Sequence, residues 1–347
     1  MANRAEARDL DVVGVGGMVV DRMHRAVSLV GDDGKEFLRP FDNGAFVALH
    51  PGGVTLNHLG WAAALGLRCG ILGRQGEDEE GRFLRATMDA REIAWDIDVV
   101  IGASSAVAEI FVDDAGSRAI YMAPGTTGEL TAEQVRDRHG PFIARAERLT
   151  TEVSMLPLSA CVEALRIANE HGVETWVDLD VPPSVALPSL GTRDELEAIL
   201  HRARVLKPSK VAVAELLGVA AGTPASELAS AARAQFENEA VVVTDGERGC
   251  AIDAIGFVGS VPAQRADVTD TTGAGDAFLG GLLAGRAAGL DWLRCGELAN
   301  AAGAFCAGQL GAFPVDPSGA REAILSRCAP HAGPLRTRLR GLASASG

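Results

Sequence analysis

The stretch at 270–281, DTTGAGDAFLGG, places a carboxylate directly behind three small residues at the start of a predicted helix. The small residues are Gly273, Ala274 and Gly275, the carboxylate is Asp276, and apolar residues then recur at helical spacing. Small side chains leave the N–H groups of a first helical turn uncovered, and those groups suit an anion. The stretch therefore predicts an anion cradle with Asp276 at its rim, where a reacting hydroxyl could meet a phosphate. The same residues would also suit a capped helix whose glycines permit close packing.

Composition narrows the kinds of partner. Of 347 residues, 47% are hydrophobic and only 5% aromatic, so the chain can bury a large core of small side chains and is not disordered. The formal net charge of −14 argues against a nucleic-acid backbone or an anionic membrane as partner. The stretch GDDGKEFL lacks the Gly-Lys-Ser/Thr ending of a P-loop, so any phosphate is held another way.

The six cysteines are scattered singly, without a CxxC pair, which suits buried reduced thiols better than disulfides or zinc ligands. The N-terminal MANRAEARDLD carries no apolar signal core, and no apolar run reaches the length of a membrane span. We therefore expect a cytoplasmic protein with neither a membrane nor a nucleic acid as partner.

Predicted strands and helices alternate along the chain, most regularly after about residue 130. This alternation predicts an α/β fold with a mostly parallel central sheet covered by helices on both faces. Ligands in such folds bind beyond the carboxyl ends of the strands, where Asp21, Asp178 and the loop at 270 fall. The early GVGG matches a dinucleotide fingerprint only loosely, because the final glycine is missing and no helical pattern follows. Residues 22–50 and 95–122 read as short strands and turns, typical of a separate small sheet.

Two motifs resemble the signatures of one family. DTTGAGDAFLGGLLAG resembles the C-terminal signature of the ribokinase (PfkB) family of carbohydrate and nucleoside kinases. PGGVTLNHLGWAAALGLRCGILGRQGEDEEGRFL resembles its N-terminal signature, about 215 residues earlier. The resemblance implies a ribokinase-like domain at 10–327, with the segments 22–50 and 95–122 inserted as a small β-sheet lid. A C-terminal tail at 328–347 would follow.

What the family resemblance implies for chemistry is ATP-dependent phosphorylation of a hydroxyl on a sugar or sugar acid. Asp276 matches the general base, and the amides of Gly273, Ala274 and Gly275 match the anion hole that stabilises charge on the transferring phosphoryl group. The sugar-binding positions of the family correspond to Asp21, Gly52, Gly53 and Asn57. Without the family, Asn57 would be an ordinary polar residue near a helix start and Asp21 a solvated strand end.

The resemblance also implies a nucleotide site and a monovalent-cation site. Thr244, Gly246 and Gly249 match the nucleotide-binding turn, and Asn300 matches a position near the adenine; turn glycines are also common for conformational reasons alone. Asp270 and Thr272 match a site for a monovalent cation such as K⁺. Val315 stands where a polar residue is usual beside that site, which weakens the expectation.

One family motif is broken. The usual Asn-x-x-Glu stretch, which helps to place hydrated Mg²⁺ and phosphates, is replaced here by Ser209 and Ala212. Ser209 could still form a hydrogen bond as a nucleotide-binding residue, whereas Ala212 cannot contact a metal shell. Mg²⁺ should still be required, since phosphoryl transfer needs its charge. Asp178 and Asp180, on one side of a strand end by their spacing, are candidates to hold its water shell. They would otherwise be two carboxylates solvated at a strand terminus.

Three functions stay open on the sequence. A sugar or sugar-acid kinase is favoured by the polar acceptor set. A nucleoside kinase is the alternative, with Trp61 and Phe46 stacking a base. A non-catalytic sugar-binding regulatory module would explain the broken motif at Ala212, although the base and its cradle argue against it. A lone lid sheet would expose an apolar face, so we expect a homodimer that pairs two lids. The sequence does not identify the acceptor or the hydroxyl that is phosphorylated.

Overall fold

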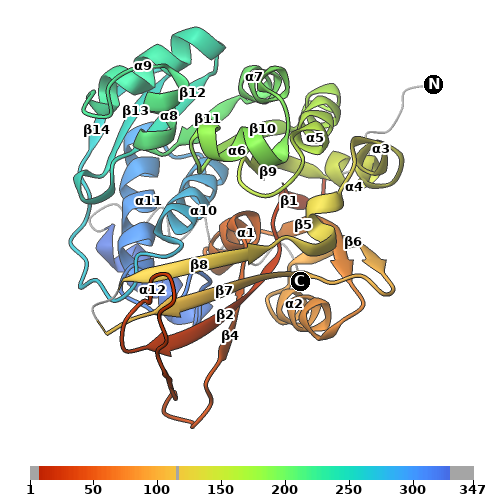
Figure 1. The fold of residues 1–347 in the computed structure, drawn as a ribbon. Coiled ribbons are helices and arrows are strands. Elements are labelled where there is room, and N and C mark those ends of the chain that lie inside the picture. The colour runs from red at the N-terminus through yellow and green to blue at the C-terminus, as the bar shows by residue number, and fades with distance from the viewer. Residues whose placement is uncertain (1–7, 115–116, 329–347) are drawn as a thin grey trace.

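The computed structural model describes residues 8–114 and 117–328 (Figure 1). The expected tail at 328–347 lies outside these residues except for Cys328. Within the described part of the chain, no helix is long and apolar enough to cross a membrane.

A sheet of nine strands forms the centre, in the order β14-β13-β12-β11-β10-β9-β1-β5-β6. Six neighbouring pairs are parallel, and only the hairpins that join β12 to β13 and β13 to β14 are antiparallel. This confirms the expected mostly parallel sheet. The bounds are β1 Leu10–Val15, β5 Cys69–Gly76, β6 Ala94–Val100, β9 Ala146–Glu152, β10 Glu174–Leu179, β11 Val205–Pro208, β12 Ala240–Thr244, β13 Cys250–Ala254 and β14 Phe257–Val261.

Helices cover both faces of this sheet, as the alternation predicts (Figure 1). Val12 belongs to one hydrophobic cluster and its neighbour Val13 to the other, because successive strand residues point to opposite faces. The first cluster contains residues of α1 Val54–Ala64, α2 Glu79–Ala90, α10 Ala274–Ala287, α11 Trp292–Cys306 and α12 Pro317–Arg327. The second contains residues of α4 Gly140–Ala144, α5 Leu158–Glu170, α6 Pro183–Leu190, α7 Arg193–Arg202, α8 Lys210–Leu216 and α9 Ala225–Phe236. The remaining short segments are α3 Ala132–Gln134, the 3₁₀ turns η1 Gly125–Glu129 and η3 Gly246–Arg248, and the π-helical η2 Val135–His139.

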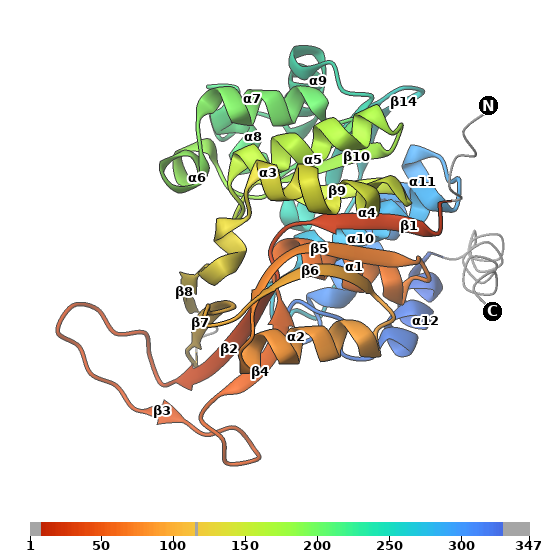
Figure 2. The ribbon, with the colours of Figure 1, turned by 90° about the vertical axis from the view of Figure 1, so that its right-hand side faces the viewer.

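A second, smaller sheet lies beside this body (Figure 2). Its strands are β2 Val19–Ala26, β3 Leu38–Arg39, β4 Ala48–Gly52, β7 Ala106–Val112 and β8 Arg118–Ala123. The order is β3-β2-β7-β8, and β4 also pairs with β2. One face buries a small cluster that includes Met23 and Ile110, with Phe41 packed against it. The segments around 22–50 and 106–123 thus share one sheet.

The expected lid segment 95–122 is wrong at its start. Residues 94–100 form β6, which pairs in parallel with β5 at the edge of the large sheet. Helix α2 connects these two strands, and a strand–helix–strand unit places both strands in parallel in the same sheet. Ile97 of β6 is accordingly buried in the core of the body.

Helices α1 and α10 approach closely enough that only glycine fits between them. A Cβ atom at Gly280 would lie 2.6 Å from the Cβ of Trp61 and 2.9 Å from the carbonyl oxygen of His58. This contact holds the start of α10 beside α1. Trp61 is fully buried there and its Nε1 donates to the carbonyl of Ala312 at 2.8 Å. The idea that Trp61 stacks a base is therefore wrong, because this side chain belongs to the core.

All six cysteines are free, as expected. Five are buried and Cys328 is partly exposed. Burial raises the pKa of every one of these thiols above its ordinary value.

Candidate active site

Asp276 lies in the first turn of α10, which begins at Ala274. Gly273 caps this helix with φ of 75°, and a Cβ atom there would lie 2.4 Å from the Cβ of Ala312. Glycine therefore permits both the left-handed backbone and the close contact. The Ala274 N–H contacts the Thr271 carbonyl at 3.3 Å, so this amide is less available to an anion than the sequence suggests.

Adjacent residues of α1 approach the two oxygens of the Asp276 carboxylate. The Asn57 amide donates to Oδ2 at 2.8 Å, and Nε2 of His58 lies 3.7 Å from Oδ1. Burial raises the pKa of Asp276 to about 7, while His58 and the Asn57 hydrogen bond act in the opposite direction. The carboxyl group can thus accept and release a proton near neutral pH.

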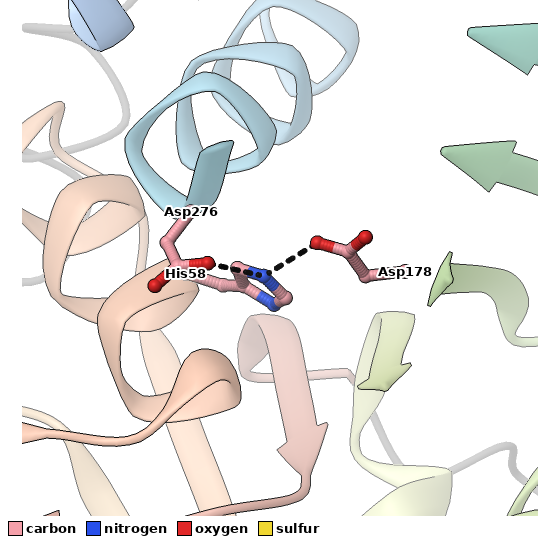
Figure 3. Close-up of side chains that lie close together, drawn as sticks. All are labelled: His58, Asp178 and Asp276. Atoms are coloured by element: carbon pink, nitrogen blue, oxygen red, sulfur yellow. Dashed lines mark hydrogen bonds and ion pairs between the residues drawn. The ribbon is translucent and has the colours of Figure 1, made fainter. Parts of the chain in front are cut away.

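His58 lies between Asp276 and Asp178 (Figure 3), and Asp178 forms a buried ion pair with Lys207. Nε2 of His58 lies 3.2 Å from Oδ2 of Asp178, and the same oxygen lies 2.7 Å from Nζ of Lys207. Burial alone would raise the pKa of Asp178, but Lys207 and His58 hold it below its ordinary value. Burial likewise opposes the charge of Lys207, yet Asp178 and Asp180 raise its pKa.

The structure separates the two proposed magnesium residues. The Asp178 side chain has no exposed surface, and one of its oxygens holds Lys207 and His58. Spacing along the strand did not show that these groups lie opposite Asp178, and its role at a hydrated ion stays a prediction. Asp180, just beyond the end of β10, is exposed, and the Ser209 hydroxyl donates to its carbonyl oxygen at 3.3 Å.

The expected acceptor residues form a continuous path from the small sheet to α10. Asp21 of β2 lies against Gly52, where a Cβ atom would fall 2.3 Å from its Oδ2. Gly53 caps α1, and Asn57 follows one turn later. Burial, together with the charge of Asp270, raises the pKa of Asp21 to about 7. Asn57 then bonds to Asp276, so the path ends at the candidate base.

The expected nucleotide residues line a cavity of about 810 Å³, within the range of small-molecule sites. Its lining includes Thr244, Gly246, Gly249, Asn300, Ala274 and Gly275, so it reaches the anion cradle. The Asn300 amide donates to the carbonyls of Val261 and Pro262, both at 3.1 Å. It therefore braces the cavity wall through its nitrogen.

Ser209 lines a neighbouring pocket of about 520 Å³ that shares Thr244 and Gly246. It caps α8 by accepting a hydrogen bond from the Ala212 N–H. Ala212 is fully buried in the core. The broken motif thus leaves a helix cap at one position and a core residue at the other.

Asp270 and Thr272 do not fit the expected cation site. The Asp270 carboxylate accepts hydrogen bonds from Thr272 N–H at 2.9 Å and Gly311 N–H at 3.1 Å, and Arg118 of β8 lies 3.4 Å from it. Arg118 also donates to the Thr272 hydroxyl. Gln309 donates to the carbonyls of Gly311 and Phe313, at 3.2 and 2.8 Å. Protein donors and a guanidinium thus use the oxygens that would bind K⁺.

Four charged or titratable residues near the site do not follow from the motifs: His58, Lys207, Arg118 and Glu152. Glu152 ends β9 opposite Asp178, is fully buried, and accepts hydrogen bonds from Gly17 N–H and the Ser154 hydroxyl. Burial raises its pKa to about 7. Two of the four could have been found from the sequence. Lysine is rare in this chain, which singles out Lys207, and His58 directly follows Asn57, a predicted acceptor residue. Arg118 and Glu152 carry no such signal.

Known proteins resemble this chain over most of its length. Fructokinase-2 from Oryza sativa is 30% identical over 313 residues, which cover 83% of this chain and 88% of the relative. The structure of Arabidopsis thaliana ribokinase complexed with ribose and ATP has a TM-score of 0.76 at 21% identity, covering 93% of this chain and 99% of that chain. A nucleoside kinase from Burkholderia thailandensis in complex with inosine has a TM-score of 0.70 at 23% identity, covering 91% and 95%.

These two structural likenesses confirm the ribokinase-like fold, while their sequence identity is too low to carry substrate or mechanism. Residues 25–318 match the pfkB family of carbohydrate kinases. The match spans most of the described chain and contains both the candidate base and the acceptor residues from Gly52 onward. The chain therefore belongs to the pfkB carbohydrate kinase family and is a sugar or nucleoside kinase.

Proposed function

We propose that this kinase transfers the γ-phosphate of ATP to a hydroxyl of a sugar or sugar acid, with Asp276 as general base. The observation that carries the proposal is the position of Asp276. Its carboxylate bonds to Asn57 on the acceptor side, while Ala274 and Gly275 in the same helical turn line the nucleotide cavity. One group thus adjoins both candidate sites, within a single domain at 10–327.

In the proposed mechanism, Asp276 takes the proton from the acceptor hydroxyl as its oxygen attacks the γ-phosphorus of ATP, and the bond from that phosphorus to the bridging oxygen breaks so that ADP leaves. Asn57 holds the carboxylate by Oδ2, and the other oxygen, which lies 3.7 Å from His58 Nε2, keeps a lone pair for the proton of the acceptor. The amides at the start of α10 stabilise negative charge that grows on the transferred group. The small sheet carries Asp21 to the acceptor and, as a lid, excludes water from the phosphate. Bound Mg²⁺ would neutralise charge on the nucleotide phosphates, and Asp180 is the residue that fits its water shell.

A nucleoside kinase remains a second candidate because of an apolar cavity on the small sheet. This cavity, of about 540 Å³, is lined in part by Met23, Phe41, Val112 and Leu310. An acceptor with an apolar ring attached to its sugar would bury that ring here. Asp21 and Asn57 would bind hydroxyl groups of a sugar or of a nucleoside, so the proposal of a sugar kinase does not depend on this cavity. A regulatory module without activity is disfavoured, because Asp276 and its cradle are both in place.

The small sheet also supports the homodimer. We propose that a second copy covers its exposed apolar side chains, which are Phe46, Leu49, Ile120, Tyr121 and Met122. A solution mass of two chains at micromolar concentration is expected by light scattering. Changing Ile120 and Met122 to Asp should give one chain per particle, and a wild-type monomer would contradict the proposal.

Replacing the base should abolish most turnover without loss of the fold. Wild type is assayed with ATP and Mg²⁺ against D-ribose, D-fructose, sugar acids, sugar phosphates, adenosine and inosine. Asp276→Asn should lower turnover of the best acceptor by about 100-fold or more, as expected for a lost general base, with an unchanged thermal midpoint. Turnover within a few-fold of wild type would remove Asp276 from catalysis.

The acceptor residues should affect the acceptor more than the nucleotide. Asp21→Ala and Asn57→Ala each remove hydrogen bonds worth about 1–3 kcal/mol where the partner is left buried and unpaired. The KM for the acceptor should rise more than the KM for ATP. Asp32→Ala, at an exposed turn between β2 and β3, serves as the control and should change neither. A selective loss of ATP affinity would contradict the assignment.

The magnesium residue should affect the metal titration alone. Asp180→Ala should need more Mg²⁺ for half-maximal rate, with acceptor KM little changed, because a carboxylate orders the ion through bound water. Asp194→Ala, exposed on α7, is the control. A glutamate at the buried position of Ala212 is not expected to restore the metal dependence, since it would bury a charge. If acceptor affinity falls while Mg²⁺ demand does not, Asp180 contacts the acceptor instead.

A further inference from the structure

His58 has a position in the site that the proposed reaction does not yet explain. Its imidazole has no exposed surface, lies one residue after Asn57 on α1, and faces two carboxylates with the same nitrogen (Figure 3). Within the described residues, its other nitrogen, Nδ1, has no hydrogen-bond partner. A buried polar atom without a partner is costly, so packing alone does not account for histidine at this position.

The two contacts of Nε2 define what the ring can do. Asp178 stays ionised beside Lys207, so Nε2 is assigned as the donor to its carboxylate, while the approach to Asp276 is a longer electrostatic contact. The nearer oxygen belongs to Asp178 at 3.2 Å, and the farther one, at 3.7 Å, belongs to Asp276. Lys207 holds Asp178 from the other side at 2.7 Å. The imidazole therefore connects a fixed buried ion pair to the candidate base.

Resting on the proposed function, we infer that His58 is a positioning residue that holds the Asp276 carboxylate in its reactive orientation through the Asp178–Lys207 ion pair. Asn57 restrains one Asp276 oxygen, and His58 restrains the other from the adjacent position on the same helix. The Asp276 side chain is 11% exposed, whereas the His58 and Asp178 side chains have no exposed surface. His58 therefore contacts Asp276 from the buried side of its carboxylate and does not contact the acceptor. The close contact of Gly280 with α1 keeps the two helices at the distance that this arrangement needs.

A metal ion bound by the same three residues is the competing assignment, since their ligand atoms lie within 4.8 Å of one another. The ammonium group of Lys207, at 2.7 Å from Asp178, already supplies the positive charge there and would repel a second cation. The positioning role is therefore favoured. Metal binding becomes an outcome of the experiment.

The structure offers a matched control. His139 is also a fully buried histidine held between two aspartates, with Nδ1 2.8 Å from Asp96 and Nε2 3.9 Å from Asp98. It belongs to η2, and its aspartates belong to β6 at the far edge of the sheet. Replacing His58 or His139 by Leu makes the same chemical change in similar surroundings, but only one of the two lies beside Asp276.

The experiment measures kcat and KM with ATP, Mg²⁺ and the best acceptor of the panel above, and ATP hydrolysis without an acceptor as a second readout. His58→Leu should lower kcat by at least about 10-fold with both KM values within about threefold, whereas His139→Leu should keep kcat. His58→Gln, which keeps a donor, should recover kcat to within about threefold of wild type. In the Asp276→Asn background, His58→Leu should cause less than about a twofold further loss, because it acts through Asp276. If His58→Leu does not fold, His58→Asn, too short to reach Asp276, replaces it.

Four kinetic results would overturn the inference. They are an unchanged kcat in His58→Leu, an equal loss in His139→Leu, a failure of Gln to restore kcat in a stably folded protein, or a full further loss in the Asp276→Asn background. One equivalent of Zn²⁺ or Mn²⁺ retained in equilibrium dialysis by wild type, and lost in His58→Gln, would assign the three residues to a metal instead. If Asp276→Asn itself leaves turnover intact, the proposed function fails. If only the His58 variants behave like wild type, the inference alone fails.

Discussion

A buried carboxylate, that of Asp276, constrains the residues around the candidate site. Taking Asp276 out of water raises its pKa to about 7, and an unpaired buried charge would not be tolerated. Three groups stabilise the charged form: the Asn57 amide and the His58 imidazole of α1, and the positive N-terminal end of α10. These partners reach Asp276 only because Gly280 lets the two helices touch. The packing of α1 against α10 therefore determines which groups surround the Asp276 carboxylate.

The two sheets position different residues of the candidate site. Glu152 at the end of β9, and Asp178 and Asp180 at the end of β10, lie at the carboxyl ends of neighbouring strands of the large sheet. Helix α10 begins on the same side. The small sheet carries Asp21 to that place on β2, the strand that follows β1 after Met18. Arg118 of β8 contacts Asp270 and Thr272 in the loop before α10, so the small sheet contacts that loop as well as carrying Asp21.

The sequence allowed the fold class to be predicted because strand and helix signals alternate regularly after about residue 130, which is typical of a parallel sheet covered on both faces. The assignment failed for 94–100, where AWDIDVV alternates like a half-exposed strand and does not say which sheet it joins. It also failed for Trp61 and did not reveal the partners of Asp178, because both sets of contacts depend on residues far along the chain. The contacts of Trp61 with Ala312 and of Asp178 with Lys207 span 251 and 29 residues. Motifs predicted the candidate base and its cradle, but the charges that modulate the base come from positions without a motif.

The reactivity of the free cysteines can report local unfolding of this protein. A thiol reacts as its thiolate, so a raised pKa together with burial keeps the sulfur atoms of Cys69, Cys161, Cys250, Cys295 and Cys306 inert while the chain is folded. They are distributed over β5, α5, β13 and α11, on both faces of the large sheet. Each therefore becomes reactive toward an alkylating reagent only when its own part of the body separates from its neighbours. The order in which the five sulfurs acquire a label would rank those parts by local stability, without any engineered probe.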